Sequence, residues 1–377
     1  MKRVVHCTNV HPWNDTRIFH KMCASLAAAG FDTHLVAIDR DAVADRLFEE
    51  KGVKVHLLAG ADIKGRRQRA LKGGRRVLAR AREIGADIVH FHDPELIPFM
   101  SLLALSRART IYDAHENLPG QVHYKNWIPR FARRPMQVLA GGLEKSATIA
   151  FDRIVGATPA IAARFPLKKR ALVQNYPIKG ELRSDTHPAT AADWQSRGQR
   201  GIYVGGITRA RGLLQLVEGI GKSEKLEAFD LVGPMQDPGL LEEAQNLPGW
   251  KKVRYHGAVP RTALPPLLAQ ARFGAVTFLP FPNHVDSQPN KLFEYLSAGL
   301  PVLASDYPLW RDILGDELAE YVDPLSGDSI AAGIDRLLSR SNAEQERCSA
   351  KAVELIEERL NWESEFASLR ALYDGLK

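Results

Sequence analysis

Two carboxylates, Asp286 and Glu294, lie eight positions apart near the three-quarter point of the chain. The residues between them predict a loop that enters a helix, and Gly299 predicts the end of that helix before a buried parallel strand at 302–304. Backbone amides at the start of a helix can face a phosphate, while two acids can accept hydrogen bonds from nearby hydroxyl groups. Sugar nucleotides carry both kinds of group. The segment therefore predicts a site for such a ligand, against the simpler alternative of an ordinary helix with an acidic cap.

A glycine-rich turn opens the second half of the chain. Strand 202–204 runs into Gly205 and Gly206, and Arg209 and Arg211 follow before the next helix. Glycine lets the backbone approach a ligand closely, and arginine can bind a pyrophosphate through two N–H groups. The alternative is a flexible turn with solvated arginines. Because this turn and the acidic pair lie at the same edge of one predicted sheet, where ligands bind open parallel sheets, we favour a shared ligand site.

Histidine and acidic residues follow two predicted strands in the first half. His115 and Glu116 come after a short strand, and His11, Asp15 and Arg17 come after the first strand. Histidine titrates near neutrality and can exchange a proton with a sugar hydroxyl or a leaving phosphate, which makes His115 a candidate catalytic residue. The segment from His11 to Arg17 could line the binding site of an acceptor substrate. Alternatively, it could be a capped helix with Arg17 in an ion pair. The sequence leaves both interpretations open.

Another cluster, His90, His92 and Asp93, has the residue types of a metal site. Side chains alternate along a strand, so His90 and His92 share one face and Asp93 points away. Without further ligands at suitable spacing, we predict a packed loop with no bound metal, and no cofactor elsewhere.

Apolar strands alternate with helical patterns along nearly the whole chain, as in parallel sheets covered on both faces. The polar stretch 179–199 predicts a linker between a domain at 1–178 and a domain at 200–358. The predicted fold class is α/β, with two doubly wound, Rossmann-like domains. The predicted strands are 4–10, 34–38, 53–58, 87–91, 110–112, 154–157 and 171–174 in the first domain, and 202–204, 229–232, 253–256, 274–279 and 302–304 in the second.

Length and composition agree with an ordinary soluble globular protein of two domains. A length of 377 residues exceeds one typical core. The three cysteines are odd in number and far apart, which fits neither a disulfide framework nor a zinc site and favours a reducing cytoplasm. The apolar run at the start is too short for a signal peptide, and no stretch approaches the roughly 18 apolar residues that span a bilayer. We therefore expect a protein that is not integral to a membrane.

The positive charge is concentrated in the first half. The formal net charge is +7, yet residues 63–82 hold nine Lys or Arg and no acid, and residues 117–143 hold four and no acid. These two stretches contribute +13, so the remainder sums to −6. Aromatic residues among the bases of 123–134 favour an anionic lipid surface. Single-stranded nucleic acid would also suit this mixture, but no nucleic-acid-binding motif is present. We predict membrane contact through 63–82 and 123–134, and no nucleic acid.

Taken together, these motifs resemble the retaining glycosyltransferases of family 4, whose GT-B fold places two Rossmann-like domains on either side of a cleft. The most specific stretch is 288–306, QPNKLFEYLSAGLPVLASD, which is similar to the form in members acting on bacterial surface polysaccharides. The family's paired acids, Glu-x7-Glu, fall on Asp286 and Glu294. The resemblance implies that Asp286 lies near the donor sugar, that Glu294 binds the ribose, and that amides around Asn290 and Lys291 meet the pyrophosphate. It also implies that a final helix, 359–377, crosses back to the first domain.

The chain departs from the family pattern at several positions. Arg211 takes the place of a lysine, and Gly206 stands where arginine is usual, with Arg209 as a substitute. Pro289 removes one N–H donor from the loop, and the first acid is the shorter aspartate. The candidate residues are His115, Asp286 and Arg211 for catalysis; Gly205, Gly206, Arg209, Arg211, Asn290, Lys291, Leu292 and Glu294 for the donor; and His11, Asp15, Arg17 and Glu116 on the acceptor side.

The resemblance implies transfer of a sugar from a UDP- or GDP-sugar to a hydroxyl of a glycan or polyprenyl-diphosphate-linked acceptor. The anomeric configuration would be kept and no metal used, in cell-surface polysaccharide biosynthesis at the cytoplasmic face of the membrane. Two alternatives remain: a sugar-nucleotide epimerase of GT-B fold, and an inactive scaffold that binds a nucleotide sugar.

Overall fold

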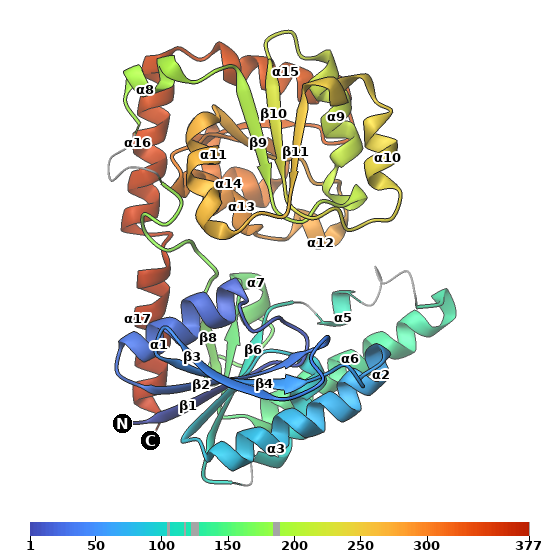
Figure 1. The fold of residues 1–377 in the computed structure, drawn as a ribbon, viewed down its shortest axis with the longest axis vertical. Helices are drawn as coiled ribbons and strands as arrows, with labels where there is room; N and C mark the ends of the chain where they lie inside the picture. The colour runs from blue at the N-terminus through green and yellow to red at the C-terminus, as the bar shows by residue number, and fades with distance from the viewer. Residues whose placement is uncertain (104–105, 117, 122–127, 184–188, 377) are drawn as a thin grey trace. The chain divides into compact units, whose positions relative to one another are not determined.

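The computed structural model describes residues 1–103, 106–116, 118–121, 128–183 and 189–376. The chain forms two compact units, one comprising Met1–Asn175 with Trp362–Lys377 and the other Tyr176–Asn361 (Figure 1). Each unit is built around one sheet with helices packed against it. None of the helices within the described ranges is both long and apolar enough to cross a lipid bilayer.

The sheet of the first unit contains eight strands. They are β1 Arg3–Cys7, β2 Asp32–Asp39, β3 Arg46–Glu50, β4 Val53–Ala59, β5 Ile88–Phe91, β6 Arg109–Ala114, β7 Arg153–Gly156 and β8 Arg170–Leu172. Their order is β3-β4-β2-β1-β5-β6-β7-β8, and all neighbours are parallel except β3, an antiparallel edge strand. The sequence prediction missed β3 because only its central Phe48 is partly buried, so the strand has no alternating apolar pattern.

Helices cover both faces of this sheet. They are η1 Thr16–Cys23, α1 Ala24–Ala28, α2 Gly65–Gln68, η2 Arg69–Gly73, α3 Gly74–Ile84, η3 Pro94–Leu96, α4 Ile97–Met100, η4 Ser101–Leu103, α5 Leu118–Gln121, α6 Arg130–Ala150, α7 Pro159–Ala162 and α17 Trp362–Gly375. Successive residues of β2 point to opposite faces, so Leu35 packs with Ile18 of η1 while Val36 packs with Val77 of α3. In Figure 1, α1 and α3 accordingly lie on opposite sides of the strands.

The sequence of 66–84 predicts one buried helical stripe, formed by Ala70, Leu71, Gly74, Val77, Leu78 and Ala81, and the structure corrects it at one position. We placed Leu71 on the inner face, but its side chain is 58% exposed. The helix is wider than an α-helix at η2, which shifts the phase of its residues, so Gly73 is buried in place of Leu71. Gly74, Val77, Leu78 and Ala81 are buried as predicted.

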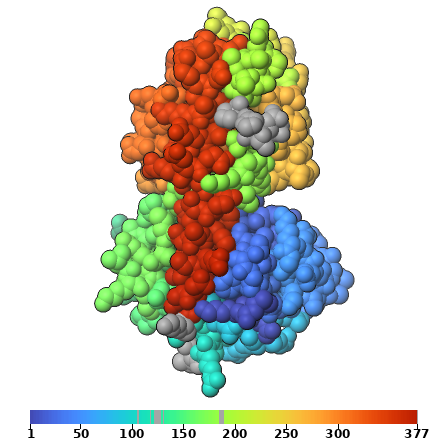
Figure 2. Space-filling view, turned by 90° about the vertical axis from the view of Figure 1, so that its left-hand side faces the viewer, coloured from blue at the N-terminus to red at the C-terminus, as the bar shows by residue number. Residues whose placement is uncertain are grey.

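The last helix of the chain, α17, belongs to the first unit. It lies across the face in Figure 2, between the N-terminal segment in blue and the later segment in green. The indole of Trp362 donates to Ser25 Oγ at 2.8 Å, and Lys2 Nζ donates to the Tyr373 carbonyl at 3.0 Å. Tyr373 itself is fully buried, and its hydroxyl lies next to His6 of β1 and His90 of β5. This helix therefore contributes a side chain to the centre of a unit that is otherwise built from the first 175 residues.

The second unit holds a six-stranded parallel sheet. Its strands are β9 Arg200–Val204, β10 Ala228–Val232, β11 Val253–Gly257, β12 Phe273–Val276, β13 Val302–Ser305 and β14 Ala319–Val322, in the order β11-β10-β9-β12-β13-β14. Its helices are α8 Ala191–Ser196, η6 Arg209–Arg211, α9 Leu213–Lys222, α10 Leu240–Gln245, η7 Pro248–Lys252, η8 Arg261–Ala263, α11 Leu264–Gln270, α12 Pro282–Val285, α13 Asn290–Ser297, α14 Pro308–Leu318, α15 Gly327–Ser339 and α16 Asn342–Glu358. On the sheet, α9 packs with α15, and α13 packs with α16.

The segment predicted as a linker, 179–199, is more ordered than its composition suggested. Its described part includes α8, which begins with a capping box between Thr190 and Asp193 and buries Trp194 completely in the core of the second unit. A single large aromatic side chain fixes the helix to the unit, although the residues around it are polar.

Candidate active site

Each sheet has one point where the chain reverses the direction in which strands are added. In the first unit this point lies between β1 and β5, and in the second between β9 and β12. Loops that leave the carboxyl ends of such strands separate and leave room for a ligand. His11 follows β1, and His115 follows β6, which is next to β5. In the second unit, Gly205 follows β9, and Asp286 follows β12.

The glycine turn of the second unit is held by close backbone contacts. Gly212 has φ 77°, and a β-carbon there would lie 2.0 Å from the carbonyl oxygen of Thr277. Thr208 caps the short helix η6 by accepting from the Arg211 N–H at 3.2 Å. The guanidinium of Arg211 then folds back and donates to the Gly206 carbonyl at 2.5 Å. The turn therefore points the Arg211 side chain at its own glycines rather than into solvent.

Lys291, in the first turn of α13, reaches the same turn. A β-carbon built on Gly205 would lie 2.6 Å from Lys291 Nζ, and one built on Gly206 would lie 2.9 Å from Arg211 Nη1. The Lys291 ammonium also lies over the rings of Tyr203 and Phe278, at 5.2 and 5.7 Å from their centres. Two cations thus occupy the space that side chains at these two glycines would fill. A side chain at Gly206 would also meet the Gln236 amide nitrogen, at 2.7 Å, so the two glycines leave room for three side-chain ends, and the two cations among them converge on one turn.

The charges around Lys291 favour the binding of an anion. Burial and the neighbouring Arg211 lower the pKa of Lys291 to about 8, and Glu294 opposes this shift. The N-terminus of α13, an eight-residue helix, begins one residue before Lys291 and adds a partial positive charge. An anion bound here would relieve the repulsion between the two cations. This is the arrangement expected for a phosphate or diphosphate group.

Glu294 is positioned by an arginine that the sequence prediction missed. Arg261 Nη1 donates to Glu294 Oε1 at 3.0 Å, and Arg261 also makes two hydrogen bonds to Glu181, at 2.6 and 2.8 Å. The two carboxylates raise the pKa of Arg261 against the effect of burial. Glu181 therefore fixes Arg261, and Arg261 fixes one oxygen of Glu294. The other oxygen of Glu294 has no hydrogen bond to any described residue and can accept one from a ligand.

The remaining predicted donor residues differ in what they offer. Asp286 is exposed at the end of α12 and makes no side-chain hydrogen bond to the described residues, while the Trp310 indole fixes its loop by donating to the Ser287 carbonyl. Arg209 forms an exposed ion pair with Glu243 at 2.8 and 2.5 Å, so its guanidinium is already engaged. Asn290 is exposed at the start of α13. The side chain of Leu292 is buried in the core and its N–H bonds the Pro289 carbonyl, so a side-chain contact with a donor is excluded.

The first unit contains a hydrogen-bonded network centred on Asp113 of β6. Arg17 donates to this carboxylate through Nε at 3.0 Å and Nη2 at 2.8 Å. His92 Nδ1 shares a hydrogen bond with Asp113 at 3.0 Å, and His115 Nε2 lies 3.2 Å from the same oxygen. His92 continues the chain to His6 at 2.9 Å. The predicted catalytic histidine is therefore oriented by a buried carboxylate on the preceding strand.

The network extends to the last helix. His90 Nδ1 shares a hydrogen bond of 2.5 Å with the Tyr373 hydroxyl, which lies 3.2 Å from His6 Nε2. Burial lowers the pKa of His6 and His90, and lowers the pKa of His92 to about 3, so these three imidazoles are neutral. Against its own burial, the Arg17 guanidinium keeps the pKa of Asp113 well below its usual range. Within the network, Arg17 and Asp113 form a buried pair of opposite charges.

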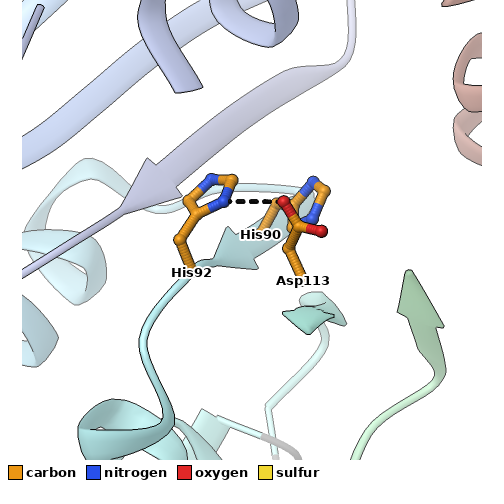
Figure 3. Close-up of side chains that lie close together, drawn as sticks. All are labelled: His90, His92 and Asp113. Carbon is orange, nitrogen blue, oxygen red and sulfur yellow. Dashed lines mark hydrogen bonds and ion pairs between the residues drawn. The ribbon is translucent and has the colours of Figure 1, made fainter. Parts of the chain in front are cut away.

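His90, His92 and Asp113 place ligand atoms within 4.8 Å of one another, as a metal site would (Figure 3). The buried Nε2 of His90 has no hydrogen-bond partner in the described part of the chain. However, Asp113 already receives both arms of Arg17 as well as His92 and His115. A dication here would face the buried guanidinium and displace these donors, which is unfavourable in an interior of low dielectric. The absence of a bound metal stays a prediction that the Arg17 pair supports.

Two of the predicted acceptor-side residues, His11 and Asp15, lie next to this network. His11 lies 3.6 Å from Asp15 and 3.5 Å from Asp93, and its ring centre is 5.6 Å from that of His115. Burial acts to lower the pKa of His11, but the two carboxylates raise it overall. Asp15 caps η1 by accepting from two backbone N–H groups. The structure thus favours the capped-helix interpretation of this segment.

The two remaining acceptor-side candidates, Arg17 and Glu116, differ in exposure, and the charge of Glu116 also acts on His11. Arg17 is only 4% exposed and its guanidinium is paired with Asp113 in the interior, so it does not line an acceptor-binding surface. Glu116 is exposed. Asp113 lies on the neighbouring strand β6, where Ile111 pairs with His90, so the register between the two strands brings Asp113 to the face that His90 and His92 share. Alternation alone predicted only the two histidines.

Comparison with protein families decides the identity of both halves. The sequence matches the "Glycosyl transferase 4-like domain" over residues 16–168 and "Glycosyl transferases group 1" over residues 198–340. The chain is a glycosyltransferase of the GT4 type. Comparison of this glycosyltransferase with curated protein sequences gives no match.

Solved structures resemble the glycosyltransferase over its full length. Sucrose-phosphate synthase from Thermosynechococcus elongatus has a TM-score of 0.78 at 18% identity, covering 100% of this chain and 99% of that one. HepE from Anabaena, solved with UDP, has a TM-score of 0.71 at 11% identity, covering 99% and 100%. The UDP-forming α,α-trehalose-phosphate synthase from Burkholderia vietnamiensis has a TM-score of 0.66 at 13% identity, covering 98% and 100%. With the two parallel sheets, these likenesses confirm the predicted GT-B fold.

Proposed function

We propose that this glycosyltransferase moves a sugar from a nucleoside diphosphate sugar to an acceptor hydroxyl with retention of the anomeric configuration. The observation that carries the proposal is the convergence of Lys291, Arg211 and the start of α13 on the turn at Gly205 and Gly206. These groups offer two cations and backbone amides to one diphosphate. Structures with the same fold are described in complex with UDP or UDP-glucose, which supports a UDP-sugar donor beside the GDP-sugar alternative.

The donor's other end is assigned to the paired acids. The free oxygen of Glu294 is available to accept from a ribose hydroxyl, because its partner oxygen is fixed by Arg261. Asp286 is exposed on the loop after β12 and can reach a hydroxyl of the transferred sugar. This part of the proposal rests on the family pattern together with the position of both residues at the switch point of the sheet.

The proposed reaction needs no metal. The bond between the anomeric carbon and the β-phosphate oxygen breaks, and the acceptor oxygen bonds to the same face of that carbon. The acceptor proton passes to the leaving phosphate. Lys291 and Arg211 stabilise the negative charge that develops on the leaving group, which is the term that electrostatic catalysis usually supplies. His115, held by Asp113, is the candidate for proton exchange with a sugar hydroxyl.

For the acceptor, we propose a glycan or a polyprenyl-diphosphate-linked sugar in cell-surface polysaccharide biosynthesis, at the cytoplasmic face of the membrane. The support is the stretch 288–306 together with the local positive charge of the first half. Of the basic segments predicted to contact the membrane, 63–82 is fully described, whereas 123–127 lie outside the described residues.

Release of the nucleoside diphosphate from a panel of UDP- and GDP-sugars tests the proposal. We expect one donor to release its diphosphate in the presence of lipid-linked or glycan acceptors, with a matching glycosylated product. Conversion of the donor to an isomer without acceptor would identify an epimerase instead. Binding of a nucleotide sugar without release or isomerisation would identify an inactive scaffold.

A further inference from the structure

Helix α6 carries an apolar face that the first unit leaves uncovered. Phe131, Val138, Leu139 and Ile149 are 85, 75, 71 and 77% exposed. They recur at helical spacing with Arg134, Pro135, Gly142, Lys145 and Ser146, which are exposed as well. We call these nine residues the α6 face. Four large apolar side chains at such exposure on one helix face are more than scattered surface hydrophobics, and they indicate an interaction surface.

The acidic residue of α6 is buried, whereas two of its basic residues are exposed. Glu144, its one acid, is buried, where it accepts from Arg164 at 2.5 Å and from the Leu118 N–H at 3.2 Å. The only charged residues on the α6 face are Arg134 and Lys145. The nine described residues of the α6 face are therefore apolar, small or positive, and none of them is acidic.

The other basic segment is a weaker candidate than its composition suggested. Acids outside the stretch 63–82 pair with at least four of its nine basic residues. Asp62 pairs with Lys72 and Arg76, Glu95 with Arg69, and Asp45 with Arg80. These pairs fix much of the charge within the unit, and the segment exposes few apolar side chains beyond Leu71. The α6 face combines exposed apolar side chains with positive charge, the two properties that favour binding to an anionic lipid surface.

We infer that the α6 face docks on a lipid bilayer containing anionic lipids. Its apolar side chains would enter the boundary between headgroups and acyl chains, while Arg134 and Lys145 contact lipid phosphates. The face from Phe131 to Ile149 extends about 27 Å along the helix, which allows it to lie in the membrane plane. A second copy of the chain is a poorer partner, because a symmetric interface would set the two positive faces against each other. The biological role of this docking rests on the proposed lipid-linked acceptor, but the test below measures only the binding of the protein to vesicles.

Co-sedimentation with vesicles tests the inference on the full chain. Vesicles of phosphatidylglycerol and phosphatidylcholine in equal parts are compared with pure phosphatidylcholine, at low and high salt. Wild-type protein should bind the anionic vesicles more tightly, and added salt should weaken this binding. The double variant Val138→Asp/Leu139→Asp should lower the partition coefficient by about tenfold or more, and Arg134→Gln/Lys145→Gln should remove the salt dependence.

A control double variant, Val43→Asp/Leu47→Asp, changes two similarly exposed apolar residues near the β3 edge. It should bind vesicles as the wild type does. Equal loss in the control, or equal binding by the α6 variants, would overturn the inference. So would a concentration-dependent dimer that only the α6 variants dissociate, measured by sedimentation velocity. Thermal unfolding and titration with UDP and GDP should be unchanged in all variants. If the wild-type protein binds neither UDP nor GDP, the proposed donor site is wrong, but the result of the vesicle experiment still stands.

Discussion

The depressed pKa of Lys291 predicts that nucleotide binding weakens as the pH rises through 8. In the free protein, burial and Arg211 hold this pKa at about 8. A bound diphosphate would stabilise the charged amine and raise its pKa, so binding is linked to protonation. The direction follows directly: below pH 8 the amine is charged before the ligand arrives, and above pH 8 a proton must be taken up on binding.

The magnitude follows from the fraction of protein that carries the proton. With a free pKa of about 8, roughly nine-tenths of Lys291 is charged at pH 7 and roughly one-tenth at pH 9. If the bound form stays protonated, the association constant falls about tenfold over this interval, or about 1.4 kcal/mol. Desolvation of the ammonium also destabilises the free fold at pH 7, by an upper limit of about 3 kcal/mol. The variant Lys291→Met should therefore bind nucleotide more weakly and unfold at a higher temperature.

Isothermal titration calorimetry with UDP and GDP at pH 7, 8 and 9 checks this prediction. Lys291→Arg is the matched control because arginine keeps its charge throughout, and its affinity should be independent of pH in this range. The reasoning is refuted if the wild type shows less than about a twofold change in affinity, or if Lys291→Arg retains the full pH dependence.

Three further predictions concern single positions. Glu294→Ala should lower turnover at least about tenfold by removing a hydrogen bond to the donor, whereas Glu320→Ala, on β14, should leave the rate unchanged; equal rates for both would refute the role of Glu294. Asp113→Asn should lower the free energy of unfolding by about 3–5 kcal/mol because the buried Arg17 loses its counter-charge, and urea unfolding that detects less than about 1 kcal/mol would contradict the network. Gly212→Ala should cost more than about 2 kcal/mol, since its β-carbon meets the Thr277 carbonyl, while Gly257→Ala, with similar φ and open space, should cost about 1 kcal/mol; similar losses would show that strain alone matters.

Local patterns predicted the elements that carry the site. Apolar strands followed by glycine or polar loops placed the turn at Gly205 and the start of α13 at one sheet edge, and the structure brings Lys291 to that turn. Alternation along the strand also predicted that His90 and His92 share a face, as their stacked rings confirm. These features depend on residues within a few positions of one another, where the sequence carries the signal directly.

Contacts between distant residues were not predictable in the same way. Arg261 reaches Glu294 from the short helix η8, and Arg17 reaches Asp113 across 96 positions, so neither pair has a local pattern. Each changes the interpretation of a predicted residue: Glu294 is held in place, and Arg17 is withdrawn from the surface. The edge strand β3 was missed for the opposite reason, because its residues are exposed and leave no apolar alternation to detect.

A crystal structure of the chain with bound UDP or GDP tests the donor site most directly. We predict that the diphosphate lies at the start of α13, within hydrogen-bonding distance of Lys291 Nζ and the Arg211 guanidinium, with the ribose hydroxyls at Glu294. A nucleotide bound with its diphosphate away from both cations, or bound only in the first unit, would contradict the proposed function.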